Sequence, residues 1–271
     1  MHKAVIIFVI VGLTLAAMPA RGQDVGLDRL IVNFSDPARP GLVRVNMVNS
    51  AIAVKSHSGR EVIIDGGQAG NRNRRPPGTD GLRRIDTPMM GLSVEEENNV
   101  MTITSRNFAP ARLEIQVPAR TNLNLKTVNG GQILVADIEG EIEVTNTNGS
   151  VVLDNVAGSV VAHATNGRVL VSLRDVTPDK PMSFTSMNAT LDVTLPANVK
   201  ANLRMRTDNG EIYSGFDITR RPGTPTTEDS RSRGGLFRVL TDQTINGTIN
   251  GGGPNFDLRT LNGNIYIRKG K

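Results

Sequence analysis

The stretch GQILVADIEGEIEVTNTNGSVVLDNVAGSVVAHATNGRVLV, residues 131–171, decides the fold. Glycine recurs in it every nine residues, and an apolar residue stands two and four positions after each of these glycines. Alternation of this kind is typical of a β-strand with one buried face. The inward positions predicted in this way are Ile133, Val135, Ile142, Val144, Val151, Leu153, Val160, Val169 and Val171. The stretch therefore predicts a series of short strands that share one core.

The turns between these strands alternate between two kinds. One kind reads Thr-Asn-Gly, as at Thr147–Gly149 and Thr165–Gly167, and the other has an apolar residue two positions before glycine, as at Ile138 and Val156. Two strands and two turns make one unit, and stacked units bury a continuous core that a single unit cannot bury. We therefore predict an all-β, β-helix-like solenoid with coils of about 18–22 residues, in which stacked asparagines form a hydrogen-bonded ladder at one corner. A meander of Asn-Gly hairpins is the alternative, because Asn-Gly also favours tight hairpin turns.

The rest of the chain carries the same pattern less regularly. Asparagine corners return at Asn188, Asn209 and Asn262, and alternating apolar segments precede residue 127. Two segments rich in Arg, Pro and Gly, 66–90 and 218–237, are predicted to be long inserted loops. Because no segment resembles a linker, we expect one domain over residues 23–271, with its most regular repeats at 127–176.

Residues 1–22 are predicted to be a signal peptide. A basic start at His2 and Lys3 is followed by an apolar run over 4–17, and Ala20 and Gly22 suit a cleavage site before Gln23, with cleavage after Ala20 as the alternative. The run of about 14 residues is short for a membrane span, which needs about 20. We therefore expect an exported protein, periplasmic or extracellular at the cell surface, with no transmembrane segment in the mature chain.

Composition argues against several kinds of site. The chain has no Cys, which excludes thiolate metal sites and a cysteine nucleophile, and its few aromatic residues argue against stacking on nucleic-acid bases or sugars. His57 and His163 have no partner ligands nearby in the sequence. We expect no catalytic residue, no metal site and no cofactor.

Positive charge is concentrated in the two loop-like segments. The net charge of +5 falls to +3 once Lys3 and Arg21 are removed with the signal peptide. Arginine clusters of this kind suit an anionic glycan, a lipid head group or an acidic protein. The candidate contact residues are Arg72, Arg74, Arg75, Arg83, Arg84, Arg220 and Arg221.

The run VPARTNLNLKTVNGG at 117–131, followed by Gly-x-Ile-x-Val units, resembles the bacterial "putative adhesin" family of β-strand-repeat proteins of unknown function. The resemblance covers roughly residues 40–270 and is strongest over 92–175. It implies a β-helix-like solenoid in an exported or envelope protein, and it brings no catalytic residue with it.

These observations predict a non-enzymatic exported envelope protein that acts as an adhesin-like or scaffold module. The expected partners are a cell-envelope protein, an anionic glycan or a second copy of the chain, and not nucleic acid. One alternative is a carbohydrate-active β-helix enzyme, a lyase or glycosidase, whose acids would meet across coils. A second alternative is an envelope-stress or assembly accessory protein.

Overall fold

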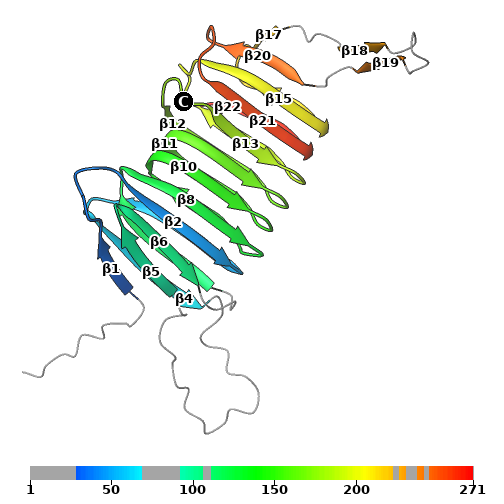
Figure 1. Ribbon diagram of the computed structural model, residues 1–271. Coiled ribbons are helices and arrows are strands. Elements are labelled where there is room, and N and C mark those ends of the chain that lie inside the picture. The colour runs from blue at the N-terminus through cyan, green and yellow to red at the C-terminus, as the bar shows by residue number, and fades with distance from the viewer. Residues whose placement is uncertain are drawn as a thin grey trace, which may run out of the picture.

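Every regular element of the chain is a β-strand in the part that the structure describes, which confirms the all-β prediction (Figure 1). The structure is a computed structural model, and it describes residues 29–68, 92–105, 111–221, 226–229, 237–240 and 244–270. Most strands join one curled sheet, and β18 (Thr226–Asp229) and β19 (Phe237–Leu240) form a separate pair.

The curled sheet consists of two ladders of hydrogen-bonded strands that face a common core. The first ladder runs, in spatial order, through β5 (Leu92–Glu97), β6 (Val100–Ser105), β2 (Gly41–Val48), β8 (Thr121–Val128), β10 (Glu139–Asn146), the second half of β11 (Val151–Ala164), β13 (Met182–Ser186), β21 (Asn255–Asn262), β15 (Ala201–Asn209), β20 (Ile245–Ile249) and β17 (Thr219–Arg221). The second ladder runs through β1 (Arg29–Asn33), β4 (Glu61–Gln68), β7 (Ala111–Pro118), β3 (Ser50–His57), β9 (Ile133–Ala136), the first half of β11, β12 (Val169–Val176), β14 (Leu191–Leu195), β22 (Ile265–Lys269) and β16 (Ile212–Ser214).

Strands at equivalent repeat positions pair in parallel. In the second ladder Ile133, Val151, Val169 and Leu191 are successive partners, at intervals of 18, 18 and 22 residues. Hairpin strands would be antiparallel, so the meander alternative is wrong for these repeats. The predicted repeat length is thus the spacing of the observed pairs.

The spatial order of the repeats differs from their order in the chain. A rung is defined here as one strand of the first ladder with the strand of the second ladder that follows it in the chain. The rung β2–β3 lies between β6–β7 and β8–β9, and the last rung, β21–β22, lies between β13–β14 and β15–β16. The rungs with corners at Asn129, Asn148, Asn166, Asn188, Asn209 and Asn262 present similar corners and similar apolar faces, so the repeat pattern does not specify which of them is the neighbour of which.

The core confirms the predicted inward face. All nine inward residues named from the sequence are buried, and they belong to one apolar cluster that both ladders share. Each strand alternates buried and more exposed positions, as a sheet with one buried face requires.

The expected asparagine ladder is present at the corner between the two ladders. Its side-chain amides donate, rung by rung, from Asn148 to Asn129, from Asn166 to Asn148 at 2.8 Å, from Asn188 to Asn166 at 2.7 Å, from Asn262 to Asn188 at 2.9 Å and from Asn209 to Asn262 at 2.8 Å. The ladder follows the spatial order of the rungs, with Asn262 between Asn188 and Asn209.

Glycine is required where neighbouring rungs approach most closely. Gly158 has a φ of +119°, and a Cβ there would collide with the carbonyl oxygen of Gly140 on the next rung. Only glycine takes this backbone conformation without strain. The nine-residue glycine period therefore reflects backbone contact between rungs.

The two predicted loops are shorter than expected. Residues 66–68 belong to β4, and β17, β18 and the start of β19 lie within 218–237. Backbone pairing with β7 and β20 extends the sheet into these segments despite their Gly and Arg content. The remainder of both segments lies outside the described residues.

We expect Val151→Asp to destabilise the fold by about 3 kcal/mol or more, because it buries an unpaired charge at a position with no exposed surface. Val161→Lys is the matched control, since Val161 is 44% exposed on the outer side of the same strand. Denaturant unfolding of both variants measures the difference. Equal stability of the two variants would contradict the assignment of the inward face.

Candidate binding surface

The sequence-predicted arginines divide into two groups. Arg72, Arg74, Arg75, Arg83 and Arg84 lie outside the described residues. Arg220 and Arg221 end β17 and are exposed. Among described strands β17 pairs only with β20, so both arginines stand at an edge of the sheet.

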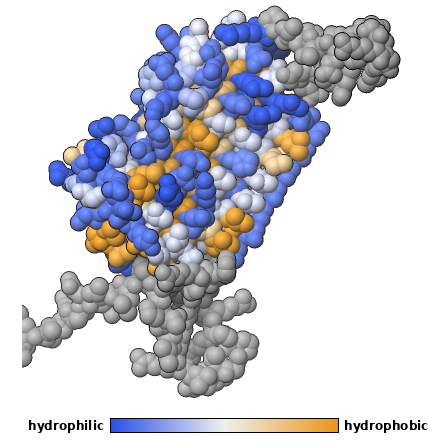
Figure 2. Space-filling view, viewed as in Figure 1, coloured by the Kyte–Doolittle hydropathy of each residue, from blue (hydrophilic) through white to orange (hydrophobic). Residues whose placement is uncertain are grey.

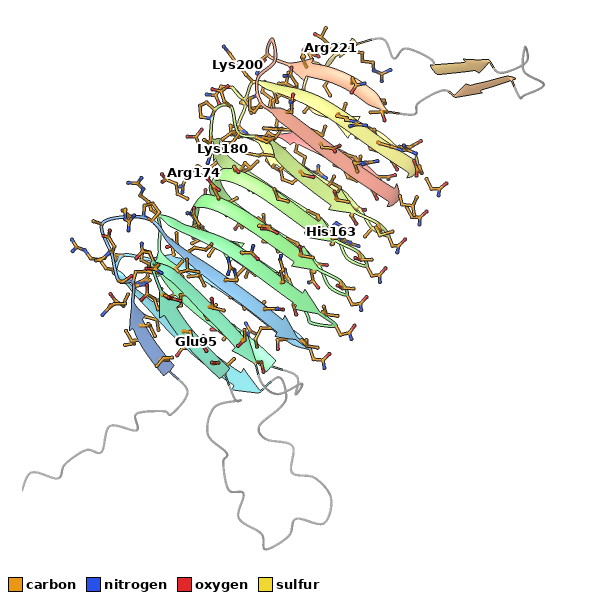
Figure 3. The ribbon with its side chains drawn as sticks, in the orientation of Figure 1. Glu95, His163, Arg174, Lys180, Lys200 and Arg221 are labelled. Carbon is orange, nitrogen blue, oxygen red and sulfur yellow. The ribbon has the colours of Figure 1, made fainter. Side chains whose placement is uncertain are left out.

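The sheet brings further arginines to the same end of the first ladder. Arg221 and Arg204 are both register partners of Asn246, so all three lie in one row across β17, β20 and β15. Arg206 and Arg259 are partners in the neighbouring row. We call Arg204, Arg206, Arg221 and Arg259 the arginine patch; Figure 3 labels Arg221 at this end, and Figure 2 shows hydrophilic side chains over much of this surface.

Two carboxylates lie within the arginine patch. Asp208 accepts a hydrogen bond from Arg206 Nε at 2.8 Å. Asp257 is the register partner of Arg204 and is half-buried, and its Oδ1 atom is buried without a hydrogen-bond partner. Four cations against two carboxylates leave the patch positive, and the rigid sheet fixes their spacing.

An aromatic pair occupies the outer side of the second ladder at the same end. The rings of Tyr213 and Tyr266, the two tyrosines of the chain, stack with centroids 5.1 Å apart and an interplanar angle of 8°. The carboxylate of Glu211 accepts a hydrogen bond from the Tyr213 hydroxyl, which raises the pKa of Tyr213. Arg268 lies 5.3 Å from the centroid of the Tyr266 ring. It also forms a bidentate ion pair with Asp192, which raises the pKa of Arg268.

Sequence reasoning missed the arginine patch and the tyrosine pair. A signal for the tyrosines existed: Asn209–Tyr213 and Asn262–Tyr266 both read Asn-Gly-x-Ile-Tyr, so the tyrosines share one repeat position. The patch had no such signal, because Arg204 and Arg259 become neighbours only through the insertion of β21 beside β15.

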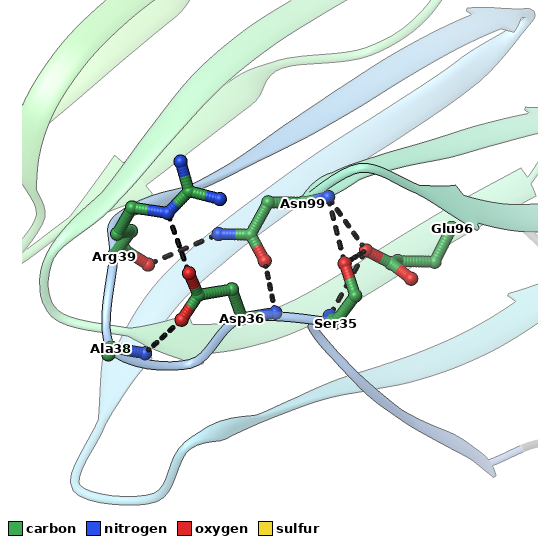
Figure 4. Close-up of polar contacts among 6 residues, drawn as sticks. All are labelled: Ser35, Asp36, Ala38, Arg39, Glu96 and Asn99. Atoms are coloured by element: carbon green, nitrogen blue, oxygen red, sulfur yellow. Dashed lines mark hydrogen bonds and ion pairs between the residues drawn. The ribbon is translucent and has the colours of Figure 1, made fainter.

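The opposite end of the first ladder is acidic. Glu95 and Glu97 are exposed on β5, whereas Glu96 points toward the core side and is half-buried. Glu96 Oε1 accepts hydrogen bonds from the Ser35 amide at 3.2 Å, the Ser35 hydroxyl at 2.8 Å and the Asn99 amide at 3.0 Å (Figure 4). Asn99 also accepts a bond from the Asp36 amide at 2.8 Å. This network fastens the turn after β1 to the β5–β6 hairpin.

The network lowers the pKa of two carboxyl groups. Hydrogen bonds from Ser35 hold the pKa of Glu96 below its ordinary value of 4.5. The Arg39 side chain, with help from the Ala38 amide, holds the pKa of Asp36 below 3.8. The ionised form of both groups is therefore favoured in the folded chain at neutral pH.

The described residues contain no cluster of three or more His, Asp or Glu side chains suited to a metal ion. His57 accepts a hydrogen bond from the Gly59 amide and so stabilises a turn, and His163 lies on the outer side of β11. A surface hollow of about 300 Å³ is lined in part by Asp175, Asp179 and Lys200, and all three are exposed.

Comparison with known proteins gives distant likenesses. No family model and no curated protein matches the chain. It is similar to a putative cell adhesion protein from Clostridium sporogenes, with 9% identity, a TM-score of 0.48, and coverage of 90% of this chain and 99% of that chain. It is also similar to a putative adhesin from Bacteroides fragilis, with 12% identity, a TM-score of 0.29, and coverage of 89% and 95%. Scores this low assign neither a fold nor a function to the chain.

Within the described residues, no helix has the length and apolar character needed to cross a membrane.

We expect acid to loosen the β5 end before the middle of the ladders. Folding lowers the pKa of Glu96 and Asp36, so their contribution to stability is present above their ordinary values and is lost as the pH falls through the folded-state values. Hydrogen-exchange protection of the Ser35 and Asn99 amides should fall as the pH drops below the ordinary values of 4.5 for Glu96 and 3.8 for Asp36. The Asn166 amide serves as the mid-ladder reference.

Glu96→Gln is the matched variant, since its amide oxygen still accepts hydrogen bonds but does not titrate here. It should remove much of the pH dependence at Ser35 and Asn99. An unchanged pH profile in this variant would show that Glu96 does not control this end.

Proposed function

We propose that this chain is a non-enzymatic, exported protein of the cell envelope, periplasmic or at the cell surface, that acts as an adhesin-like binding scaffold. The observation that carries the proposal is the arginine patch, which holds four guanidinium groups on one face of a rigid sheet. The ligand class that we propose is an anionic glycan of the envelope.

We infer further that the two ladders are the two sides of a β-helix-like solenoid in one domain covering 23–271, after a signal peptide at 1–22. The 18-, 19- and 22-residue spacing of parallel partners supports this inference. So does the asparagine ladder, since it needs equivalent corners stacked in register.

The chemistry of arginine supports an acidic glycan. A guanidinium group offers a planar set of donors that matches a carboxylate or sulfate in two-pronged geometry. Arg204 and Arg259 are exposed, and parallel pairing sets neighbouring strands about 4.8 Å apart. A polymer with regularly spaced negative groups would contact several of these arginines at once, and the sum of weak contacts would give useful affinity.

A binding role fits the described surface better than catalysis does. The carboxylates of Asp175 and Asp179 in the surface hollow are exposed, and the half-buried Asp257 lies among arginines on the outer face of the sheet. A lyase or glycosidase would need acidic or basic groups brought together in a cleft around the bond to be cleaved.

The test is binding to immobilised polygalacturonate, measured in 50 mM and 300 mM NaCl. We expect affinity to fall steeply with salt, because exposed charges are screened over about 8–10 Å near physiological ionic strength. Arg204→Ser with Arg259→Ser should weaken binding by about tenfold or more at low salt, with the melting temperature nearly unchanged.

Lys55→Ser with Arg168→Ser is the control, because it removes the same charge from exposed positions outside the patch. Arg72→Ser with Arg74→Ser and Arg75→Ser tests the segment predicted from the sequence. Loss of binding in this triple variant alone would move the site from the patch to that segment. Release of unsaturated or reducing sugar ends from polygalacturonate would overturn the non-enzymatic assignment.

A further inference from the structure

Each ladder ends in a strand with one described partner. The first ladder ends at β5 and β17, and the second at β1 and β16. A strand at a sheet edge presents backbone N–H and C=O groups that can pair with another strand. The two ends of the molecule are therefore the places where the sheet can be extended.

The two edges of the first ladder carry opposite charge on the same outer face. Glu95 and Glu97 alternate with core-side residues on β5, so they lie on its outer side. Arg221 lies on the outer side of β17, in the row of Arg204, whereas Arg220 is exposed but lies in the row of Gly247 and Leu203 and so projects from the other side of the strand. Figure 3 shows Glu95 and Arg221 at opposite ends of the molecule. An acidic edge and a basic edge on one molecule are complementary between two copies.

Strand direction is compatible with pairing between these edges. β20 is antiparallel to β15, and β17 is antiparallel to β20, so β17 runs with the parallel strands of the ladder. β5 is antiparallel to β6 and runs against them. Placing the β5 end of one copy on the β17 end of another, with the same faces aligned, brings the two edges together as an antiparallel pair.

At each end of the molecule one ladder extends further than the other, and the ladder that extends further differs between the two ends. At one end the first ladder extends past rung β15–β16 by β20 and β17, whereas the second ladder stops at β16. At the other end the second ladder extends past rung β6–β7 by β4 and β1, and the first ladder by β5 alone. The ladder that projects further at one end is the one that projects less at the other.

Apolar side chains are exposed at the edges of the second ladder. Ile31 on β1 is 59% exposed, and Tyr213 on β16 is 46% exposed. In the same head-to-tail arrangement these two edges face each other across a gap about one strand wide. Three strands (β20, β17 and β5) lie between the end rungs in the first ladder, and two (β4 and β1) in the second.

We propose that copies of this chain associate head to tail, with β17 of one copy pairing antiparallel with β5 of the next and Arg221 meeting Glu95 and Glu97. The contact joins two different surfaces, so it does not close after two copies and yields chains of increasing length. This inference does not rest on glycan binding, because it uses the edge strands and not Arg204 or Arg259.

Sedimentation velocity over a range of protein concentrations, in 50 mM and 500 mM NaCl, tests the proposal. We expect a continuous rise in mass with concentration at low salt, and less association at high salt. A single closed dimer, or a monomer at every concentration in low salt, would overturn the proposal.

A charge exchange identifies the edges. Arg221→Glu makes the outer face of both end strands acidic, and Glu95→Arg with Glu97→Arg makes it basic at both ends. Each variant alone should associate at least about tenfold more weakly than the wild type, because like charges then face each other. An equimolar mixture of the two variants should recover association, since each acidic end again meets a basic end.

Arg168→Glu is the control, because it changes charge at an exposed position in the middle of the molecule. It should associate like the wild type. Failure of the mixture to associate when both variants have wild-type melting temperatures would exclude pairing between β17 and β5. Loss of glycan binding by the Arg204 and Arg259 variant with association intact would separate this inference from the proposed function.

Discussion

Hydrogen bonding between parallel strands in register is the constraint on which the rest of this structure depends. Strands about 4.8 Å apart place the same repeat position of each rung above that of its neighbour. Inward aliphatic residues therefore stack into one core, and asparagines at the corner stack into a ladder of amide hydrogen bonds. The same spacing leaves no room for a side chain at Gly158, beside the carbonyl group of Gly140.

A ladder of this kind must end, and its ends differ from its middle. Antiparallel strands adjoin both ladders at one end, as β4 and β5, and the first ladder alone at the other end, as β20. At the β5 end, Glu96 and Asn99 tie the edge hairpin to the turn at Ser35 and Asp36. At the other end, four arginines and two stacked tyrosines project from the sheet. Repetition builds the rigid middle, and residues that break the repeat supply the chemically distinctive surfaces.

The strands and their inward residues could be predicted from the sequence because the patterns that identify them involve residues close together in the chain. The glycine period and the alternation from Ile133 to Val171 suffice to identify strands, inward residues and the asparagine corner. They do not identify neighbours, because β21–β22 offers the same corner and apolar face as any other rung. The arginine patch and the tyrosine pair depend on β21–β22 lying beside β15–β16, and for that reason they became visible only in the structure.

The order of the rungs is the central claim of this account, and disulfide trapping tests it most directly. The chain has no cysteine of its own, so within one molecule a disulfide can form only between the two introduced cysteines. Thr185 and Arg259 are register partners, and Arg206 is the partner of Arg259 on its other side. Oxidation should therefore cross-link Thr185→Cys with Arg259→Cys rapidly, and Thr185→Cys with Arg206→Cys poorly. The reverse result would mean that the rungs stack in chain order, which would contradict the insertion of β21–β22 and the arginine patch that it creates.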